Sequence, residues 1–357
     1  MKDRLTAISL FSGAGGMDVG FHNAGFDVIM ACELDKHACD TYNRNAHLNG
    51  HAGEPVYPMS VRDLPDDLPD VDVIFGGPPC QGYSVAGKMD PDDERSTLIF
   101  DFFDIIMKVK PKGFVCENVP ALATSAKWAG VRDRIGDIIS DVYLVSTFVL
   151  NARDYGVPQS RERMFMLGVR RDLVKDEDVT TGLMNEALSQ QKKSPPTLRS
   201  LLVSLGKVGN GENPDTCKAK VTFAKNPVLR KSPYAGMLFN GGGRPLDPSK
   251  TSSTLPASMG GNRTPIIDEI NLDDEEDSFV QDYHALLMAG HEPAGGQAPD
   301  RLRRLTTKEC QAIQSFPKEY EFCGPVSSVY RQIGNAVPCL LAEAVAEAVR
   351  AGIINTD

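Results

Sequence analysis

Short apolar segments alternate with helix-like segments through residues 5–170, and this alternation restricts the fold more than any other feature of the sequence. Strand-like segments occupy residues 7–11, 28–32, 71–75, 113–116, 144–150 and 164–169, and helix-like segments occupy residues 17–24 and 98–106. Strands that alternate with helices usually form a mostly parallel sheet that is covered on both faces. We therefore predict an α/β fold, in which the last two strands can pair antiparallel.

The pattern changes in the second half of the chain. Residues 192–261 are rich in Gly, Pro, Ser, Thr and Lys and have no clear period, but Leu, Val, Met and Phe still recur. This composition indicates a smaller, irregular domain of β-strands and loops rather than a disordered segment. The alanine-rich residues 337–353 indicate a helix. We predict a first domain of residues 1–185, completed by residues 326–357, and a second domain of residues 186–325.

Charge is distributed unevenly along the chain, which has a formal net charge of −10. Residues 191–263 contain twelve Lys and Arg but three Asp and Glu, a net +9, so the remainder carries −19. A basic segment within an acidic protein is typical of a face that binds a polyanion such as nucleic acid. The alternative is a solvated loop region whose lysines have no common role.

The eight cysteines are scattered and include no Cys-x-x-Cys pair, and the six histidines are equally dispersed. This pattern suits a reducing cytoplasm and argues against a disulfide framework, a zinc site or another metal site. The first residues lack the apolar region of a signal peptide, and no apolar run reaches the length of a membrane span. We therefore expect a cytoplasmic protein without a membrane partner.

One cysteine lies in an unusual setting. Cys80 follows residues 76–79 (Gly-Gly-Pro-Pro), directly after the predicted strand 71–75. The prolines fix φ and remove two amide donors, so the turn cannot relax into a helix. The carboxyl ends of parallel strands are where α/β sheets bind their ligands. A buried cysteine that packs as a small apolar side chain is the alternative, but the rigid frame favours a nucleophile.

A second turn has the composition of a cofactor site. Residues 11–16 (Phe-Ser-Gly-Ala-Gly-Gly) lie between a predicted strand and a predicted helix, where a nucleotide or nucleoside can meet a helix N-terminus. No Gly-Lys-Ser/Thr follows, so the turn is not a P-loop. Glu33 follows the next strand, where an acid can bind a ribose diol. A nucleoside-containing cofactor therefore fits better than a dinucleotide, and the alternative is a tight turn without a ligand.

Several motifs occur in the order found in the DNA (cytosine-5) methyltransferases, and the chain resembles this family over most of its length outside the basic segment. The motifs are residues 11–16, Pro78-Pro79-Cys80-Gln81, Glu117-Asn118-Val119, residues 159–163 (Gln-Ser-Arg-Glu-Arg), residues 303–306 (Arg-Arg-Leu-Thr), residues 314–317 (Gln-Ser-Phe-Pro) and residues 331–338 (Arg-Gln-Ile-Gly-Asn-Ala-Val-Pro). A single match can arise by chance, but the ordered set favours membership. The resemblance to the bacterial restriction-modification members implies a Rossmann-like, S-adenosylmethionine-dependent catalytic domain and a target-recognition domain.

The resemblance thus implies S-adenosyl-L-methionine as the cofactor. The residues that it assigns to the cofactor site are Phe11, Ser12, Gly13, Ala14, Gly15, Gly16, Glu33, Leu34, Ser60, Val61, Pro78, Leu98, Asn335 and Ala336. One of them departs from the family pattern, because Ser60 stands where an acid that contacts the adenine amino group is expected. Ser60 can take that role less strongly, or Asp63 can replace it.

The resemblance also implies a covalent mechanism on cytosine. The Cys80 thiolate is expected to add to C6 of a base flipped out of the duplex, so that C5 attacks the methyl group. The products are 5-methylcytosine and S-adenosylhomocysteine. Glu117 is expected to hydrogen-bond N3 and to act there as an acid with a raised pKa, and Arg161 and Arg163 to favour the thiolate. The alternatives are a capping or salt-bridged Glu117 and a surface pair of arginines.

The partner that the resemblance implies is double-stranded DNA. The expected DNA contacts are Gln81, Ser84, Arg244, Thr254, Leu255 and Arg263, while the basic segment binds phosphates. We expect a monomer associated with the bacterial nucleoid, and a cognate restriction endonuclease, where one exists, that acts separately. Two other functions stay open: a tRNA cytosine methyltransferase of the same fold, and a DNA-binding regulator that has lost catalysis.

Overall fold

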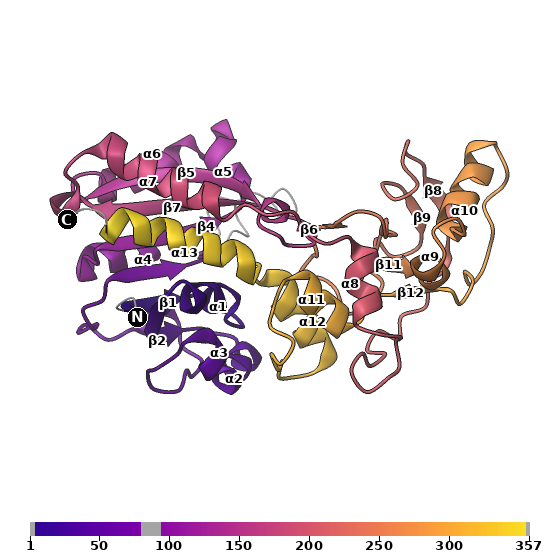
Figure 1. The fold of residues 1–357 in the computed structure, drawn as a ribbon, viewed down its shortest axis with the longest axis horizontal. Coiled ribbons are helices and arrows are strands. Elements are labelled where there is room, and N and C mark those ends of the chain that lie inside the picture. The colour runs from indigo at the N-terminus through magenta and orange to yellow at the C-terminus, as the bar shows by residue number, and fades with distance from the viewer. Residues whose placement is uncertain (1–3, 80–93, 355–357) are drawn as a thin grey trace.

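The structure is a computed structural model that describes residues 4–79 and 94–354, with side chains from residue 97 onwards in the second range. Three residues of the site expected from the sequence, Cys80, Gln81 and Ser84, lie outside the described residues. Figure 1 shows two lobes. The first half of the chain and the C-terminal helix form one lobe, and most of the second half forms the other.

A six-stranded sheet forms the centre of the first lobe, in the order β2-β1-β3-β4-β7-β5. Its strands are β1 (Leu5–Leu10), β2 (Phe26–Cys32), β3 (Val73–Gly76), β4 (Gly113–Asn118), β5 (Tyr143–Asn151) and β7 (Glu162–Arg170). Strands β1 to β4 run parallel, whereas β7 is antiparallel to both β4 and β5. The predicted α/β fold and its antiparallel final pair are confirmed.

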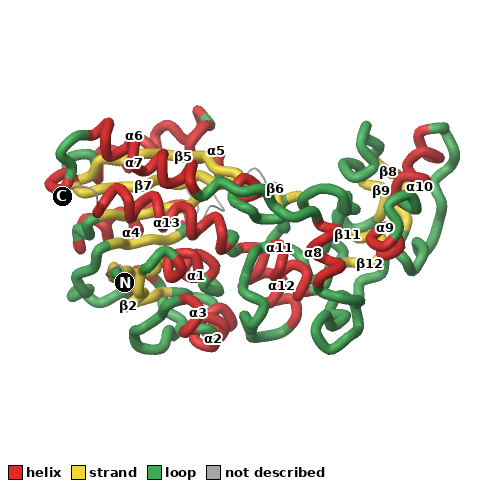
Figure 2. The backbone as a smooth tube through the Cα atoms, viewed as in Figure 1, coloured by secondary structure: helices red, strands yellow, loops and turns green. Residues whose placement is uncertain are grey.

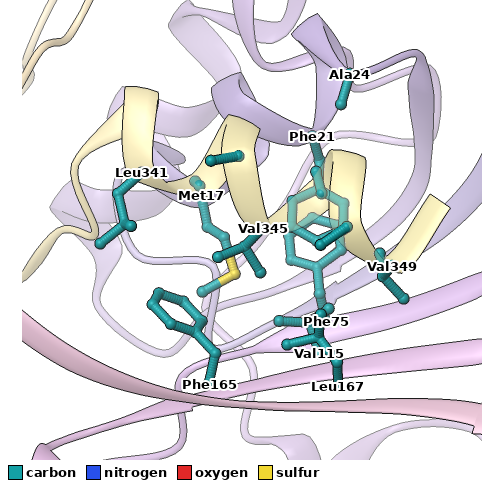
Figure 3. Close-up of a cluster of buried hydrophobic side chains, with 14 of the residues drawn as sticks. Met17, Phe21, Ala24, Phe75, Val115, Phe165, Leu167, Leu341, Val345 and Val349 are labelled. Carbon is teal, nitrogen blue, oxygen red and sulfur yellow. The ribbon is translucent and has the colours of Figure 1, made fainter. Parts of the chain in front are cut away.

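Helices cover both faces of this sheet, because its strands are apolar on both sides. One face carries α1 (Gly16–Asn23), α7 (Glu177–Gln190) and α13 (Cys339–Ile354), and the other carries α4 (Glu94–Val109), α5 (Pro120–Thr124) and α6 (Ala129–Ile139). Figure 3 shows the core beneath α1 and α13, where Phe21 stacks on Phe75 with ring centroids 3.8 Å apart. Both rings are fully buried, and the burial of each contributes about 1.5–3 kcal/mol.

The last helix returns to the first lobe, where α13 packs against both α1 and α7 (Figure 1). Helices α13 and α1 approach so closely that a Cβ added at Gly20 would lie 2.4 Å from the backbone nitrogen of Glu343. The small alanines of α13 permit this approach, and Pro338 precedes its first residue, where proline is tolerated. The helix predicted at residues 337–353 is confirmed, with both ends shifted by one or two residues.

The second lobe consists mostly of loops (Figure 2). Its elements are β8 (Phe223–Val228), β9 (Met237–Phe239), β11 (Ile266–Asp268), β12 (Leu302–Arg304), α8 (Leu198–Ser204), α9 (Glu269–Asp273), α10 (Phe279–Met288), α11 (Thr307–Ile313) and α12 (Val326–Asn335). Two short strands, β6 (Gln159–Ser160) and β10 (Ser252–Ser253), pair where the lobes meet. The irregular character predicted for this region is confirmed. Helix α8 was not anticipated, because its seven residues are too few to show a helical period.

The two C-terminal helices belong to different cores. Tyr330 and Ile333 of α12 pack with Leu198 of α8 in a core of the second lobe. Val345 of α13, in contrast, belongs to the core beneath the central sheet. A link back to the first lobe comes from Arg331, whose guanidinium lies 2.6 Å from the carboxylate of Asp35, directly before α2 (Lys36–Arg44). Helix α3 (Ala46–Asn49) follows α2 at the β2 edge of the molecule.

Candidate active site

The predicted cofactor turn lies at the carboxyl end of β1, directly before α1. Phe11, Gly13 and Gly15 have positive φ values of 56°, 55° and 80°, and the two glycines adopt this conformation at no steric cost. The carboxylate of Glu33 holds the turn from the neighbouring strand. One of its oxygens accepts the backbone N–H of Gly13 at 2.8 Å, and the other accepts the N–H groups of the two residues that follow Glu33.

The turn is open on one side and closely packed on the other. A Cβ added at Gly13 would have no neighbour within 4 Å. A Cβ added at Gly16 would lie 2.7 Å from the carbonyl oxygen of Val337 and 3.1 Å from the ring of Phe316. Two motifs from the end of the sequence therefore support the packed side. The open side, with the acid Glu33 beside it, fits a nucleoside-containing cofactor.

Ser60 and Asp63, the two candidates for contact with adenine, lie on one segment beside Glu33. The backbone N–H of Met59 donates to the carbonyl of Glu33 at 2.8 Å. Ser60 then caps the short 3-10 helix Val61–Asp63, and its hydroxyl accepts the N–H of Arg62 at 3.3 Å. Asp63 is exposed at the end of this helix. Ser60 directly follows the residue that is bonded to Glu33, whereas Asp63 lies four residues beyond it.

The remaining predicted cofactor residues differ in exposure. Leu34 is 68% exposed directly after Glu33. Asn335 is exposed at the end of α12, Ala336 and Leu98 are partly buried, and Pro78 and Val61 are buried. An exposed leucine beside the acid offers an apolar surface for a ligand, whereas Val61 packs in the core beneath α4 and can meet a ligand only through its backbone.

Glu117, near the end of β4, lies against the segment that follows β3. A Cβ added at Gly77 would lie 2.8 Å from Glu117 Oε2. The side-chain amide of Asn118 donates to the carbonyl of Pro78 at 3.3 Å. Gly77 is three residues before Cys80, so Glu117 lies beside the segment that leads to the predicted nucleophile, which itself is outside the described residues.

Burial controls the protonation of Glu117. Its side chain is 14% exposed, and Arg163 Nε lies 2.9 Å from Oε1. Burial raises the pKa of Glu117 above its usual range, while the charges of Arg163 and Arg161 act to lower it. The raised pKa has the direction that an acid at N3 requires. The salt-bridged carboxylate, which the sequence left as the alternative, is therefore present together with the raised pKa.

Arg161 joins the two lobes and is not a surface residue. Its side chain is 3% exposed. The guanidinium donates to the carbonyl of Leu255 at 3.2 Å and to the carbonyl of Gly334 at 3.0 Å. Leu255 belongs to the second lobe, and Gly334 lies on α12, so one side chain holds three segments together. The surface pair considered for the two arginines is excluded for Arg161.

A buried pair of glutamines beside Arg161 was not anticipated from the sequence. Gln159 Nε2 donates to Gln314 Oε1 at 2.8 Å, and Gln159 Oε1 accepts the N–H of Leu255 at 2.8 Å. Gln314 donates in turn to the carbonyl of Ile333 at 2.6 Å. Both glutamines are 0% exposed. Their presence in two of the family motifs was the only sequence signal for them, because their partners are far away along the chain.

The predicted DNA contacts divide into exposed and buried residues. Arg244 and Arg263 are exposed on neighbouring loops of the second lobe. These loops are joined by a hydrogen bond from the backbone N–H of Gly243 to the carbonyl of Asn262 at 3.0 Å. Thr254 is also exposed. The structure therefore brings the two arginines together on one accessible surface.

The DNA contact predicted for the Leu255 side chain is wrong. This side chain is 0% exposed and packs with Leu198 and Ile313 in the core of the second lobe. Its backbone is occupied by Gln159 and Arg161. The neighbouring Thr254, in contrast, is exposed.

Within residues 4–79 and 94–354, no group of three or more His, Cys, Asp and Glu side chains is arranged to hold a metal ion. No helix in the same part of the chain combines the length and apolarity needed to cross a membrane. The seven cysteines described there are all free thiols.

Comparison with known proteins gives consistent matches. The model of the C-5 cytosine-specific DNA methylase family matches residues 5–351. Type II methyltransferase M.FnuDI of Fusobacterium nucleatum is 32% identical over 350 residues, which cover 96% of this chain and 93% of the relative. Type II methyltransferase M.MthTI of Methanothermobacter thermautotrophicus is 30% identical over 362 residues, covering 97% and 98%. A solved structure of a putative DNA modification methyltransferase from an Escherichia coli prophage shares the fold, with a TM-score of 0.64 at 24% identity and coverage of 97% and 98%.

Proposed function

The chain belongs to the C-5 cytosine-specific DNA methylase family and is a DNA (cytosine-5-)-methyltransferase of the restriction-modification type, and on this basis we propose its reaction. The enzyme transfers the methyl group of S-adenosylmethionine to C5 of a flipped-out cytosine in a specific short duplex sequence. The observation that supports this reaction most is the buried carboxylate of Glu117. It lies beside Gly77 at the carboxyl end of the parallel strands, where the cofactor turn also lies.

The open side of the cofactor turn is where the cofactor would bind. Glu33 would accept hydrogen bonds from its ribose hydroxyls, and the backbone of residues 13–16 would surround its amino-acid end at the start of α1. The pocket would be completed by Leu34, Ser60, Val61, Pro78, Leu98, Asn335 and Ala336. When bound, S-adenosylmethionine supplies an electrophilic methyl group.

The side chains near Glu117 would activate the base. Cytosine C5 is a weak nucleophile until the aromaticity of the ring is broken. The Cys80 thiolate adds to C6, and electron density moves to N3, where protonated Glu117 donates its proton. C5 would then bond to the methyl carbon as the sulfur–methyl bond of the cofactor breaks and S-adenosylhomocysteine leaves. Water would remove the C5 proton as the C5–C6 double bond forms again and Cys80 is expelled as a thiolate, and N3 would return its proton to Glu117. Arg161 and Arg163 add positive charge that favours the thiolate.

Recognition of DNA is assigned to the second domain. We place catalysis in residues 1–185 with residues 326–357, and target recognition in residues 186–325. The net charge of +9 in residues 191–263 supports binding of phosphates. Base contacts are assigned to the exposed Arg244, Thr254 and Arg263 and to Gln81 and Ser84, around a cytosine that has left the duplex.

The enzyme is proposed to act alone. It would be a monomer that acts on DNA of the nucleoid. The dispersed cysteines suit the reducing bacterial cytoplasm. The Type II relatives support a cognate restriction endonuclease that is a separate protein.

Labelled S-adenosylmethionine, incubated with genomic DNA and in parallel with tRNA, tests the reaction. Bisulfite sequencing then maps 5-methylcytosine. Cys80→Ala is the decisive variant, and Cys323→Ala is its matched control, because Cys323 lies in the loop before α12, outside the proposed site. Calorimetric titration with S-adenosylhomocysteine shows whether Cys80→Ala still folds and binds the cofactor product.

We expect methylation in one short DNA motif, which Cys80→Ala loses and Cys323→Ala keeps. Label in tRNA alone would replace DNA by RNA as the substrate. Label in neither nucleic acid, from a protein that binds S-adenosylhomocysteine, would contradict the proposed reaction. Methylation that persists in Cys80→Ala would contradict the covalent step but not the substrate.

A further inference from the structure

Tyr320 connects the second half of the chain with the cofactor turn. It lies in the segment between α11 and α12, and its side chain is 1% exposed. Its hydroxyl donates to the backbone carbonyl of Ala14 at 2.5 Å, across 306 residues of sequence. This contact reaches the turn from its packed side, and the proposed reaction steps make no use of it.

The hydrogen bond fixes one peptide unit of the turn. The carbonyl between Ala14 and Gly15 is bound by Tyr320, and the N–H of the same peptide unit donates to the carbonyl of Ser12 at 3.0 Å. With both ends held, this peptide cannot rotate freely, and Gly15 keeps its φ of 80°. A Cβ added at Gly15 would lie 2.6 Å from the Tyr320 hydroxyl, so the turn and the tyrosine are closely fitted.

The position of the Tyr320 ring is itself well determined. The ring packs on Phe316 and Phe322, with centroids 4.8 Å and 5.5 Å away. Tyr42 lies on the same side of the turn, 3.2 Å from the position of a Cβ at Gly15. Its hydroxyl donates to the buried carboxylate of Asp18 at 2.7 Å. The hydroxyl of Tyr320 is thus held in an interior formed by aromatic rings.

We propose that Tyr320 is a positioning residue for the cofactor: by holding the peptide unit between Ala14 and Gly15, its hydroxyl keeps the open side of the turn in the shape that binds S-adenosylmethionine. The inference rests on the proposed use of that cofactor. Without the hydroxyl, the Ala14 carbonyl would be buried without this donor, and the turn would rearrange to satisfy it. The binding-competent shape would then be populated for only part of the time, which weakens binding in proportion.

Tyr320→Phe removes only the hydroxyl, and Tyr330→Phe is its matched control. The hydroxyl of Tyr330 also donates to a backbone carbonyl, that of Leu305 at 2.7 Å, and its ring is equally buried, but in the core of the second lobe. Calorimetric titration with S-adenosylhomocysteine reports on the cofactor site without DNA or turnover. We expect Tyr320→Phe to bind about tenfold more weakly than wild type. We expect Tyr330→Phe to bind as wild type, and kcat at saturating cofactor to be unchanged in Tyr320→Phe.

Equal affinity for S-adenosylhomocysteine in all three proteins would overturn the proposal, and so would an equal loss in both variants. A wild-type protein that does not bind S-adenosylhomocysteine would instead overturn the proposed use of the cofactor. Amide hydrogen exchange of the ligand-free wild type provides a test that needs no variant. We expect the Gly15 amide to be protected, and rapid exchange there would overturn the proposal even if Tyr320→Phe does not fold.

Discussion

The guanidinium of Arg163 lies 2.9 Å from the carboxylate of Glu117, and the two side chains are 17% and 14% exposed. Burial and the arginine act on this carboxyl in opposite directions. Burial prevails and raises the pKa of Glu117, and the charge of Arg163 limits the rise. The same carboxyl group is therefore both the partner of an ion pair and the proposed acid, and Arg163 determines how far its pKa rises.

We expect Arg163→Met to raise the pKa of Glu117 further, because the variant removes a charge that favours the carboxylate. Glu117 acts in its protonated form, so activity is lost as pH rises through its pKa. The alkaline limb of the activity profile should therefore move to higher pH. Hydrogen exchange at C5 of target cytosine, followed against pH, measures this. Arg170→Met is the control, since Arg170 pairs with Asp172 at the other end of β7; an unmoved alkaline limb would contradict the role of Arg163.

A second expectation concerns Asp18 and stability. Burial raises the pKa of Asp18 from 3.8 to about 7, although the hydrogen bond from Tyr42 acts to lower it. Between about pH 4 and pH 7 the folded protein therefore keeps a proton that the unfolded chain releases. The contribution of Asp18 to stability therefore falls as pH rises through this window, by at most about 1.4 kcal/mol per pH unit.

Asp18→Asn should remove this contribution to the slope of the free energy of unfolding against pH. Urea unfolding at several pH values between about 4 and 7 measures it. Asp40→Asn is the control, because Asp40 is a surface carboxylate paired with Lys36. If the wild type and Asp18→Asn gave parallel curves, Asp18 would not titrate in this range.

The buried glutamine pair leads to a third expectation. Gln159→Leu would leave Gln314 Oε1 and the N–H of Leu255 without their donor and acceptor, and each unsatisfied buried group costs about 1–3 kcal/mol. The free energy of unfolding should fall accordingly. Gln190→Leu, at an exposed position of α7 where the side-chain amide donates to Glu186, should change the free energy of unfolding little. Equal stabilities of the two variants would show that the buried network contributes nothing.

The central sheet could be predicted because its strands are buried on both faces. Residues 71–75 are apolar and β-branched, and they contain most of β3, the strand that Phe21 packs against. The second lobe could be predicted only as irregular. Its core brings together Leu198, Leu255 and Ile313, which are far apart in the sequence. A periodic pattern of apolar residues within one segment cannot predict contacts of this kind.

Some residues of the candidate site could likewise be predicted from the sequence, and others could not. Glu117 and Glu33 could be predicted because each lies at the carboxyl end of a parallel strand, where α/β folds bind their ligands. Tyr320 could not, because its partner Ala14 is 306 residues away and a tyrosine in a loop gives no sign of what its hydroxyl binds. The Leu255 error has a related cause. Thr254 and Leu255 are neighbours in the sequence, and nothing in the local sequence indicates which of the two side chains faces the core.

Because the Leu255 side chain is buried, we expect its substitution to affect the stability of the protein and not its recognition of DNA. Leu255→Ala would open a cavity in the second core and should lower the free energy of unfolding by about 2–5 kcal/mol. It should leave the preferred DNA sequence unchanged. Thr254→Ala, at the exposed neighbouring position, provides the comparison. Bisulfite mapping on a library of duplexes measures preference, and a changed methylation motif in Leu255→Ala would contradict the structural role assigned here.

Arg244 and Arg263 remain available to an external partner. Among the arginine side chains that the structure describes, only the guanidinium groups of these two and of Arg230 make no ion pair, hydrogen bond or ring contact. A guanidinium without an internal partner can bind a guanine edge through two hydrogen bonds, or a phosphate through its charge. These two contacts differ in what they do to DNA binding, so a substitution can distinguish them.

We expect Arg263→Ala to cost about 1–3 kcal/mol at one position of the methylated sequence, because a base contact discriminates between bases. The salt dependence of binding should change little. Lys250→Ala is the control, since Lys250 lies in the same basic segment but is paired with Asp247. Methylation rates on duplexes that differ at single positions measure the preference. A uniform loss over all sequences, with a shallower salt dependence, would show instead that Arg263 binds a phosphate, because phosphate contacts carry no sequence information and release counterions.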